Sequence, residues 1–193
     1  DIEAVARRHG LSIHMDGARL FNAAVAQNIP ATDITRHVDS VTFCLSKGLC
    51  APVGSVLCGS RDFVHRARRA RKSLGGGMRQ AGVLAAAGIV ALNGMVERLT
   101  DDHARARRLA EGMAQMPGIR VDLDRVRTNI VFFDLTDDVA LSPVEIVERM
   151  KQSAGVLVGT NGPRGFRAVT HYWIGDDDIS SFLGSLADAL NGA

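Results

Sequence analysis

The sequence contains no apolar run that is long enough and free enough of charge to span a bilayer; even the apolar stretch 81–90 is too short. It has no His-Glu-x-x-His and no Cys-x-x-Cys pattern, so we expect no zinc site with the usual ligand spacing. Its three cysteines, an odd number without paired spacing, are typical of reduced thiols in a cytoplasmic protein. The net charge of +2 is too small to draw the whole molecule to a polyanion. These absences predict a cytoplasmic protein without a metal site, a membrane segment or a nucleic-acid partner.

The N-terminal residues carry neither an initiating methionine nor a secretory signal. Residues 1–10 instead have the pattern of a helix already under way, which ends at Gly10 in the C-cap position. We therefore expect a chain that was cut on its N-terminal side, with a substantial part of the fold upstream of Asp1. The 193 residues present are enough to bury a core in one or two domains.

A single lysine, Lys47, stands in the stretch 40–55, where an apolar, β-branched strand ends and small residues follow. If Lys47 is buried there without an acidic neighbour, desolvation favours the neutral form of its amine. A neutral lysine amine forms Schiff bases with aldehydes, including that of pyridoxal 5'-phosphate (PLP). The alternative is a lysine that caps the strand and extends to the surface.

A carboxylate, Asp16, closes another predicted strand at 11–15, and a helix is predicted from Gly17 onward. The order strand, helix, loop, strand between Asp16 and Lys47 predicts a βαβ crossover between parallel strands. The carboxyl ends of such strands lie on one edge of the sheet, where open α/β sheets bind ligands. A pyridine cofactor needs an acid at its ring nitrogen and an amine at its aldehyde, on opposite sides of the ring. The two residues therefore predict a PLP site.

With these segments in view, the chain resembles the threonine aldolase family of PLP enzymes, within the aspartate-aminotransferase-like (fold type I) group. The matching segments occur in the family's order and span most of the chain: His14–Arg19, Ser46–Leu49 with Ala51–Ser55, Arg71 and Lys72 with Gly75–Gln80, and Arg167–His171. The resemblance implies an α/β fold in which residues 1–97 are the C-terminal portion of a PLP-binding large domain with a mainly parallel sheet. Residues 98–193 would form a small C-terminal α+β domain. A homodimer or homotetramer is also implied.

Local patterns predict the other elements. A short strand at 53–58 precedes a helix at 78–94 that is apolar all round, which suggests burial, either within the fold or against a partner subunit in the implied oligomer. The domain boundary is placed along the next predicted helix, 95–116. Beyond it, the patterns predict an antiparallel sheet with strands at 119–123, 129–135, 156–160 and 166–170 and helices at 142–153 and 176–190.

Two arginines are candidates for binding an anion. Arg19 follows Asp16 by three residues, and Arg167 stands in an apolar strand with no adjacent acid. The resemblance implies that both bind the carboxylate of an amino-acid substrate and that Arg19 also lies near the cofactor. The alternative for Arg167 is a salt bridge to a protein carboxylate. His14 and His171 have weaker claims, because both fit ordinary hydrogen-bonded core histidines.

The most basic run, 66–72, allows three interpretations. It fits a solvated helix face, or a nucleic-acid patch, although no aromatic residues are interleaved for base stacking. The resemblance implies instead that Lys72 and Arg79 reach the cofactor or substrate region, either within one subunit or across a subunit interface. The glycines at 75–77 could present N–H groups to an anion at the start of the following helix, or act as a flexible joint.

The resemblance implies PLP-dependent aldol cleavage of a β-hydroxy amino acid, threonine or allo-threonine, to glycine and an aldehyde. In the family, the histidine that stacks on the cofactor and the main phosphate-binding loop come from sequence upstream of Asp1, so we expect the chain alone to be nearly inactive. Another fold-type-I reaction, β-elimination or transamination, is an alternative because it would use the same Lys47 and Asp16. A non-catalytic oligomerisation or basic binding module is the alternative from a different class.

Overall fold

The chain folds into two compact units, Asp1–Leu99 and Thr100–Ala193, in a computed structural model that describes residues 1–192. The sequence placed its boundary between residues 97 and 98. The assignment of the two parts to a cofactor domain and a small domain stays a prediction.

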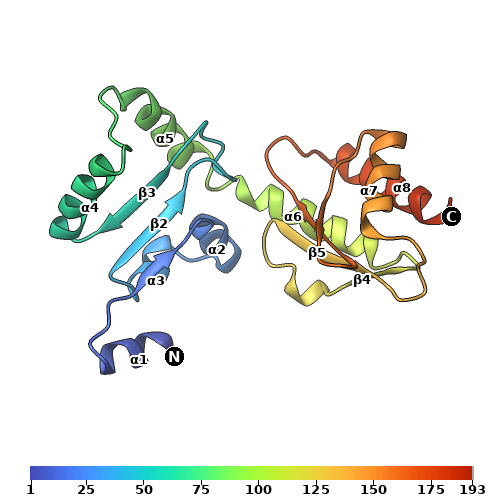
Figure 1. Ribbon diagram of the computed structural model, residues 1–193, viewed down its shortest axis with the longest axis horizontal. Coiled ribbons are helices and arrows are strands. Elements are labelled where there is room, and N and C mark those ends of the chain that lie inside the picture. Colours follow the sequence, from blue (N-terminus) through green and yellow to red (C-terminus); the bar gives the residue numbers. More distant parts are fainter. Residues whose placement is uncertain (193) are drawn as a thin grey trace. The chain divides into compact units, whose positions relative to one another are not determined.

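The first unit is a three-stranded sheet with short helices (Figure 1). Its elements are α1 (Ile2–Arg8), β1 (His14–Asp16), α2 (Leu20–Gln27), α3 (Ala31–Thr35), β2 (Ser40–Cys44), β3 (Ser55–Gly59), α4 (Arg61–Ser73) and α5 (Gly82–Gly94). The strand order is β1-β2-β3. The five-residue helix α3 lies where the sequence predicted only a loop.

The predicted crossover between parallel strands is confirmed. β1 and β2 are neighbours and pair in parallel, with Asp16 opposite Thr42, and α2 and α3 lie between them in the chain. β3 runs antiparallel to β2, so only one of the two pairings in this sheet is parallel. The link between β2 and β3, residues 45–54, contains no helix, and a crossover to a parallel position needs a dozen or more residues.

The core of the first unit lies on one face of this sheet. Val41 and Phe43 of β2 are buried, and Phe21 of α2 meets Phe43 edge to face, with ring centroids 5.2 Å apart. Successive strand residues point to opposite faces, so Ser40 and Thr42 belong to the other face. That second face is polar, and it carries the residues of β1 that pair with them.

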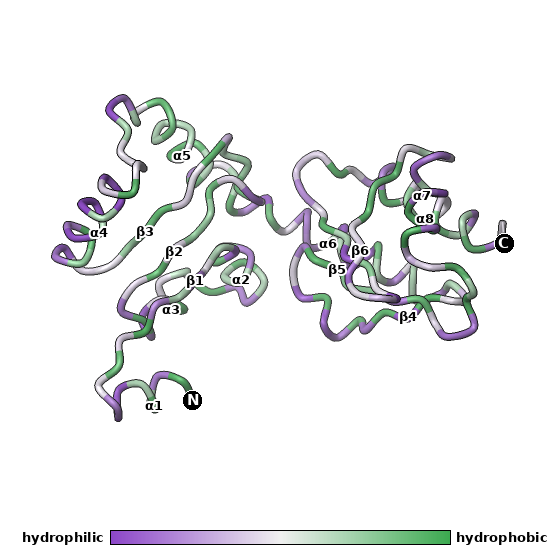
Figure 2. The backbone as a smooth tube through the Cα atoms, viewed as in Figure 1, coloured by the Kyte–Doolittle hydropathy of each residue, from purple (hydrophilic) through white to green (hydrophobic). Residues whose placement is uncertain are grey.

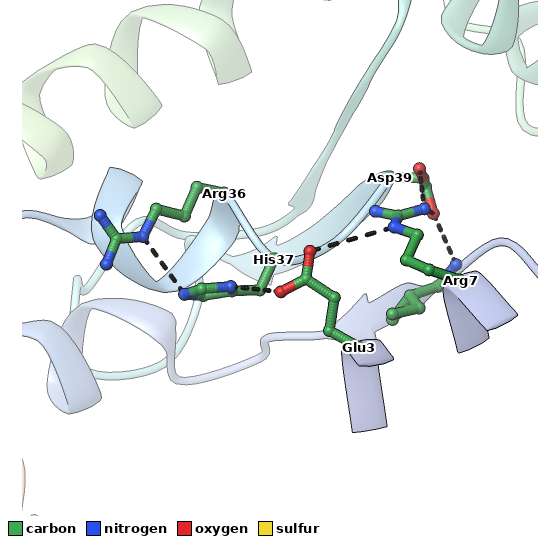
Figure 3. Close-up of polar contacts among 6 residues, drawn as sticks. Glu3, Arg7, Arg36, His37 and Asp39 are labelled. Carbon is green, nitrogen blue, oxygen red and sulfur yellow. Dashed lines mark hydrogen bonds and ion pairs between the residues drawn. The ribbon is translucent and has the colours of Figure 1, made fainter. Parts of the chain in front are cut away.

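Helix α1 is attached to the first unit by charged side chains (Figure 3). Arg7 donates from Nη1 to both Asp39 oxygens, at 2.9 and 3.0 Å, and the Ile13 N–H donates to the same carboxylate at 2.7 Å. The Ile13 N–H and then Arg7 lower the pKa of Asp39. His37 Nδ1 lies 2.6 Å from Glu3 Oε2. These contacts fix the start of the chain beside the loop that leads into β2.

The glycine run 75–77 ends helix α4. The Gly75 N–H donates to the Lys72 carbonyl at 3.2 Å and the Gly76 N–H donates to the Arg71 carbonyl at 2.8 Å. Gly75 has a φ of +83°, a conformation that suits glycine. The N–H groups of Gly75 and Gly76 are therefore used within the chain, which does not agree with the interpretation of these two glycines as donors to an anion. Helix α5 begins at Gly82 rather than at residue 78, because these residues close α4 instead of opening the next helix.

Helices α4 and α5 differ sharply in polarity (Figure 2). α4 is basic and has no buried residue, which agrees with the interpretation of its run as a solvated face. α5 carries no charged side chain, and only Gly88 and Ala91 in it are buried. Its apolar character was predicted; within this chain Val83 and Val90 are exposed, and burial against a partner subunit stays a prediction.

The second unit is a four-stranded antiparallel sheet, as predicted, in the order β4-β5-β7-β6. Its elements are β4 (Ile119–Val121), η1 (Leu123–Arg125), β5 (Ile130–Leu135), α7 (Pro143–Ala154), β6 (Gly159–Asn161), β7 (Gly165–Val169) and α8 (Asp176–Asn191); helix α6 (Leu99–Met113) begins at the last residue of the first unit (Figure 1). β6 is shifted toward the turn relative to the predicted strand 156–160.

Helices α6, α7 and α8 supply the buried partners of one face of this sheet. The buried strand residues include Val131, Phe133 and Leu135 of β5 and Phe166 of β7. Phe133 stacks on Phe166 with ring centroids 4.6 Å apart. The alternate residues belong to the other face, where Phe132 is exposed. The second unit is therefore a two-layer α/β sandwich with an apolar interior.

His103 in α6 makes the stability of the second unit depend on pH. Burial lowers the pKa of His103 below its ordinary 6.5, against the opposing charge of Asp102. The unfolded chain therefore binds this proton more readily, so the contribution is full above about pH 6.5 and is lost as pH falls toward the lowered pKa. We expect unfolding midpoints of His103→Gln to depend less on pH between about 7.5 and 5.5 than those of the parent chain. If the urea midpoints of the two proteins changed equally with pH, this expectation would be contradicted.

Within residues 1–192, no single helix is long and apolar enough to cross a membrane; only α5 and α6 taken together, with a 67° bend between them, meet the length and composition criteria.

Candidate active site

Asp16 is the last residue of β1, and its backbone is held firmly against β2. The Gly17 N–H donates to the Thr42 carbonyl at 2.7 Å, and the Cys44 N–H donates to the Ala18 carbonyl at 3.3 Å. The carboxylate is exposed, and its Oδ1 accepts the Ala18 N–H at 3.2 Å. The strand end thus presents an oriented carboxylate with access to solvent.

Lys47 follows β2 by three residues, in a loop closed by backbone hydrogen bonds. The Cys50 N–H donates to the Lys47 carbonyl at 2.9 Å, and Leu45 pairs with both Gly54 and Ala51. Leu49 is buried on one side of the loop, while Lys47 is exposed. Burial of Lys47, the condition for a neutral amine, is therefore not met in this chain, and its exposure agrees with the alternative of a surface lysine: the apolar neighbours pack inward and anchor the loop, and they leave the lysine outside.

Each of the two residues is followed by a glycine that close packing requires. A Cβ on Gly17 would lie 3.1 Å from a Val41 methyl carbon and 3.2 Å from the Thr42 carbonyl oxygen. A Cβ on Gly48 would lie 2.7 Å from Leu99 Cδ2, and Leu99 is completely buried. The glycines therefore let the ends of β1 and β2 pack tightly beneath Asp16 and Lys47.

The geometry brings Asp16 and Lys47 to one edge of the sheet. Both follow the carboxyl ends of neighbouring parallel strands, as predicted. His14 lies on the same strand face as Asp16, with Nδ1 2.9 Å from Ser40 Oγ and Nε2 3.4 Å from Thr42 Oγ1. His14 is exposed, so it is hydrogen-bonded but not a core residue. An accessible carboxylate and an accessible amine on one edge fit the ring nitrogen and the aldehyde of PLP.

The other candidates of the first unit are Arg19, Lys72 and Arg79, and they lie on different elements of that unit. Arg19 is the N-cap residue of α2, half-buried with a buried Nε, and it follows Asp16 by three residues. Lys72 is in the last turn of α4 and Arg79 is in the segment before α5, and both are exposed. Their segment follows β3, which the strand order separates from β1 by β2. The sheet therefore groups Arg19 with Asp16 and leaves Lys72 and Arg79 on the opposite flank.

Arg167 is in the second unit, on β7, opposite Phe132 of β5 and Gly159 of β6. It is exposed and lines a pocket of about 600 Å³ together with His171. Both residues were candidates from the sequence, and the structure places them in one pocket. Their roles stay predictions.

A buried polar cluster at the end of β7 was missed by the sequence reasoning. Thr170 Oγ1 donates to the Asp102 carbonyl at 2.6 Å, and Asn129 Nδ2 donates to the Thr170 carbonyl at 2.8 Å. Asp102, Asn129 and Thr170 are each at most 2% exposed. The only signal in the sequence was a polar residue at a core position of each element, and no sequence spacing joins the three.

Among residues 1–192, no group of three or more His, Cys, Asp and Glu side chains is placed to hold a metal ion. Cys44, Cys50 and Cys58 form no disulfide bond within the described residues.

The chain is similar to known proteins over segments that include Asp16 and Lys47. A family model described as beta-eliminating lyase matches residues 1–137. Low-specificity L-threonine aldolase 1 of Arabidopsis thaliana is 44% identical over 186 residues, which cover 96% of this chain and 52% of that protein. Low specificity L-threonine aldolase of Escherichia coli (strain K12) is 44% identical over 174 residues, which cover 90% of this chain and 50% of that protein. The chain spans about half the length of the curated relatives it matches.

Solved structures share the fold. Threonine aldolase of Leishmania major superposes with a TM-score of 0.77 at 21% identity, over 98% of this chain and 55% of that one. Alanine–glyoxylate aminotransferase of Nostoc sp. superposes with a TM-score of 0.67 at 14% identity, over 98% of this chain and 56% of that one. These likenesses confirm the predicted α/β fold class.

Proposed function

This chain belongs to the beta-eliminating lyase family, and on that premise we propose that it carries part of the active site of a PLP-dependent carbon–carbon lyase. The reaction proposed is aldol cleavage of a β-hydroxy amino acid, threonine or allo-threonine, to glycine and an aldehyde. The names of the relatives support this choice of reaction. The observation that carries the proposal is the exposed pair Asp16 and Lys47 at the ends of neighbouring parallel strands.

Each residue of the site has one task in this proposal. Lys47 would hold the cofactor through its aldehyde, and Asp16 would hold a proton on the ring nitrogen. When bound, PLP supplies an electron sink for the pair of electrons left when the Cα–Cβ bond breaks. Arg19 and Arg167 would bind the substrate carboxylate and so orient the scissile bond. Lys72 and Arg79, on the opposite flank of the sheet, would contribute positive charge to the cofactor or substrate region across a subunit interface.

The chain alone is expected to bind PLP weakly and to turn over little. It covers about half of its relatives, and the resemblance implies that the stacking histidine and the phosphate loop lie outside these 193 residues. Homodimers or homotetramers are the proposed assembly, again from the resemblance. A high turnover by the chain alone would show that the further residues are dispensable.

Product analysis tests the reaction type. Two alternative reactions, β-elimination and transamination, would use the same Lys47 and Asp16. The description of the matched family favours the first, and the likeness to an aminotransferase favours the second. We expect incubation of the chain with PLP and L-threonine to give traces of glycine and acetaldehyde in equal amounts. Replacing Lys47 by alanine should remove both products. A keto acid in their place would establish one of the two alternative reactions.

A further inference from the structure

The pocket beside Arg167 combines polar groups on the β7 segment and on α8 with apolar walls. Its volume of about 600 Å³ lies in the range of ligand sites, and Leu157, Val158 and Ile174 supply apolar surface. Arg167 and His171 both line it from the β7 segment. Four residues of extended chain put their Cα atoms roughly 13 Å apart, a span that their two long side chains can close around a small ligand.

Burial along β7 indicates that Arg167 and His171 share a side of the strand. Phe166, Ala168 and Thr170 are buried, whereas Arg167 is exposed and His171 is half-buried. The Thr170 N–H donates to the Asn129 carbonyl at 3.0 Å, which continues the strand pairing one residue beyond Val169. Residues of odd number therefore alternate with the buried ones as far as His171.

The local hydrogen bonds define what His171 can offer a ligand. The Trp173 N–H donates to His171 Nδ1 at 3.3 Å, so this nitrogen is the acceptor and the neutral ring carries its proton on Nε2. The Ile174 N–H donates to the His171 carbonyl at 2.8 Å, which holds the backbone turn. His171 is thus a fixed side chain with a single N–H donor remaining.

The buried polar cluster holds Thr170, the residue that precedes His171 in the chain. Thr170 donates to the Asp102 carbonyl and accepts at its own carbonyl from Asn129. Of the other polar lining groups, Asp178 has Oδ2 engaged with the Gly175 N–H at 2.7 Å. Arg167 and His171 line the pocket as two donors from the β7 segment, and Ser181 of α8 adds a hydroxyl.

We propose that His171 is a specificity-determining residue, which donates from Nε2 to the side-chain hydroxyl of an amino acid whose carboxylate is bound by Arg167. The inference rests on the proposed function and adds to it the group that selects hydroxy amino acids over their deoxy analogues. A site that donates to a ligand hydroxyl discriminates against a ligand that lacks it, because the donor is then left without a partner.

The test is NMR titration of the ¹⁵N-labelled full chain with L-threonine and with L-2-aminobutyrate, which lacks only the hydroxyl. We expect threonine to bind roughly three- to tenfold more tightly, the range that one net hydrogen bond gives. H171N keeps an acceptor for the Trp173 N–H but removes the donor at the Nε2 position, so it should bind both ligands with the affinity of aminobutyrate. H171Q keeps a donor near that position and should retain the preference for threonine.

The other outcomes are decisive against the proposal. Equal weakening of both ligands in H171N would mean that His171 only supports the fold, and a preserved preference in H171N would exclude it as the donor. An absence of threonine-dependent shifts in the parent chain would also overturn it. Arg167→Gln should weaken the binding of both ligands, and unchanged affinities in this variant would also overturn the proposal, because Arg167 is the carboxylate-binding residue in it. The proposed function is tested separately through Lys47, which lies in the first unit.

Discussion

Replacing Lys47 by alanine is expected to remove most of the pyridoxyl label that borohydride reduction fixes on the chain in the presence of PLP. Reduction traps even weakly populated Schiff bases, which suits a chain that carries only part of a site. The sequence contains three lysines, Lys47, Lys72 and Lys151, so the distribution of label can be read by peptide mass spectrometry. We expect Lys47 to take roughly tenfold more label than Lys151, the ratio that about 1.4 kcal/mol of site binding gives.

Two controls accompany this measurement. Lys151→Ala removes an exposed lysine of the second unit and should leave the label on Lys47 unchanged. Asp16→Asn keeps the shape of the side chain but removes the negative charge that would face the ring nitrogen, so it should reduce the label on Lys47 without touching that lysine. Equal labelling of all three lysines in the parent chain would show that Lys47 is an ordinary surface amine.

Phe133→Ala is expected to lower the free energy of unfolding of the second unit by about 3–5 kcal/mol, the usual cost of deleting a buried phenylalanine. Phe133 is 1% exposed, stacks on Phe166 and meets Phe182 edge to face at 6.2 Å. The loss is a large part of the roughly 5–15 kcal/mol that a domain has. Urea unfolding measures the loss in the free energy of unfolding, and hydrogen exchange of the β5 and β7 amides assigns the loss to the second unit.

Phe132→Ala is the matched control, because it makes the same deletion one residue earlier on the same strand. Phe132 is 51% exposed on the other face, so its loss should cost no more than about 1 kcal/mol. Similar costs for the two variants would mean that the open face of the sheet is as well packed as the interior. The comparison therefore tests the two-layer description of the second unit directly.

The site residues of the first unit were predictable because they follow a local rule. A strand, a helix and a second strand in sequence predict parallel neighbours, and the carboxyl ends of such strands must share an edge. Asp16 and Lys47 needed nothing further to be grouped, and the resemblance to the threonine aldolase family, confirmed by the matched family and relatives, rested on the same segments. Their sequence neighbours Gly17 and Gly48 are explained by packing that only the structure shows.

Three features of the first unit were left open by the sequence, each for a physical reason. The burial of Lys47 depends on which side of a tight loop faces the core, and the apolar residues Leu45 and Leu49 occupy that side. The glycine run 75–77 closes α4 through hydrogen bonds to carbonyls that lie one helical turn back. The direction of β3 depends on the absence of a helix in a ten-residue link.

The sequence by itself determined the α/β class, the parallel pair of strands, the antiparallel sheet of the second unit and the placing of Asp16 and Lys47 on one edge. Each follows from hydrophobic period and connection length, which are properties of neighbouring residues. Only the tertiary structure decided that Lys47 is exposed, that Asp102, Asn129 and Thr170 form one buried cluster, and that His171 shares a pocket with Arg167. Burial and hydrogen-bond partners depend on segments far apart in the chain, and no local pattern specifies them.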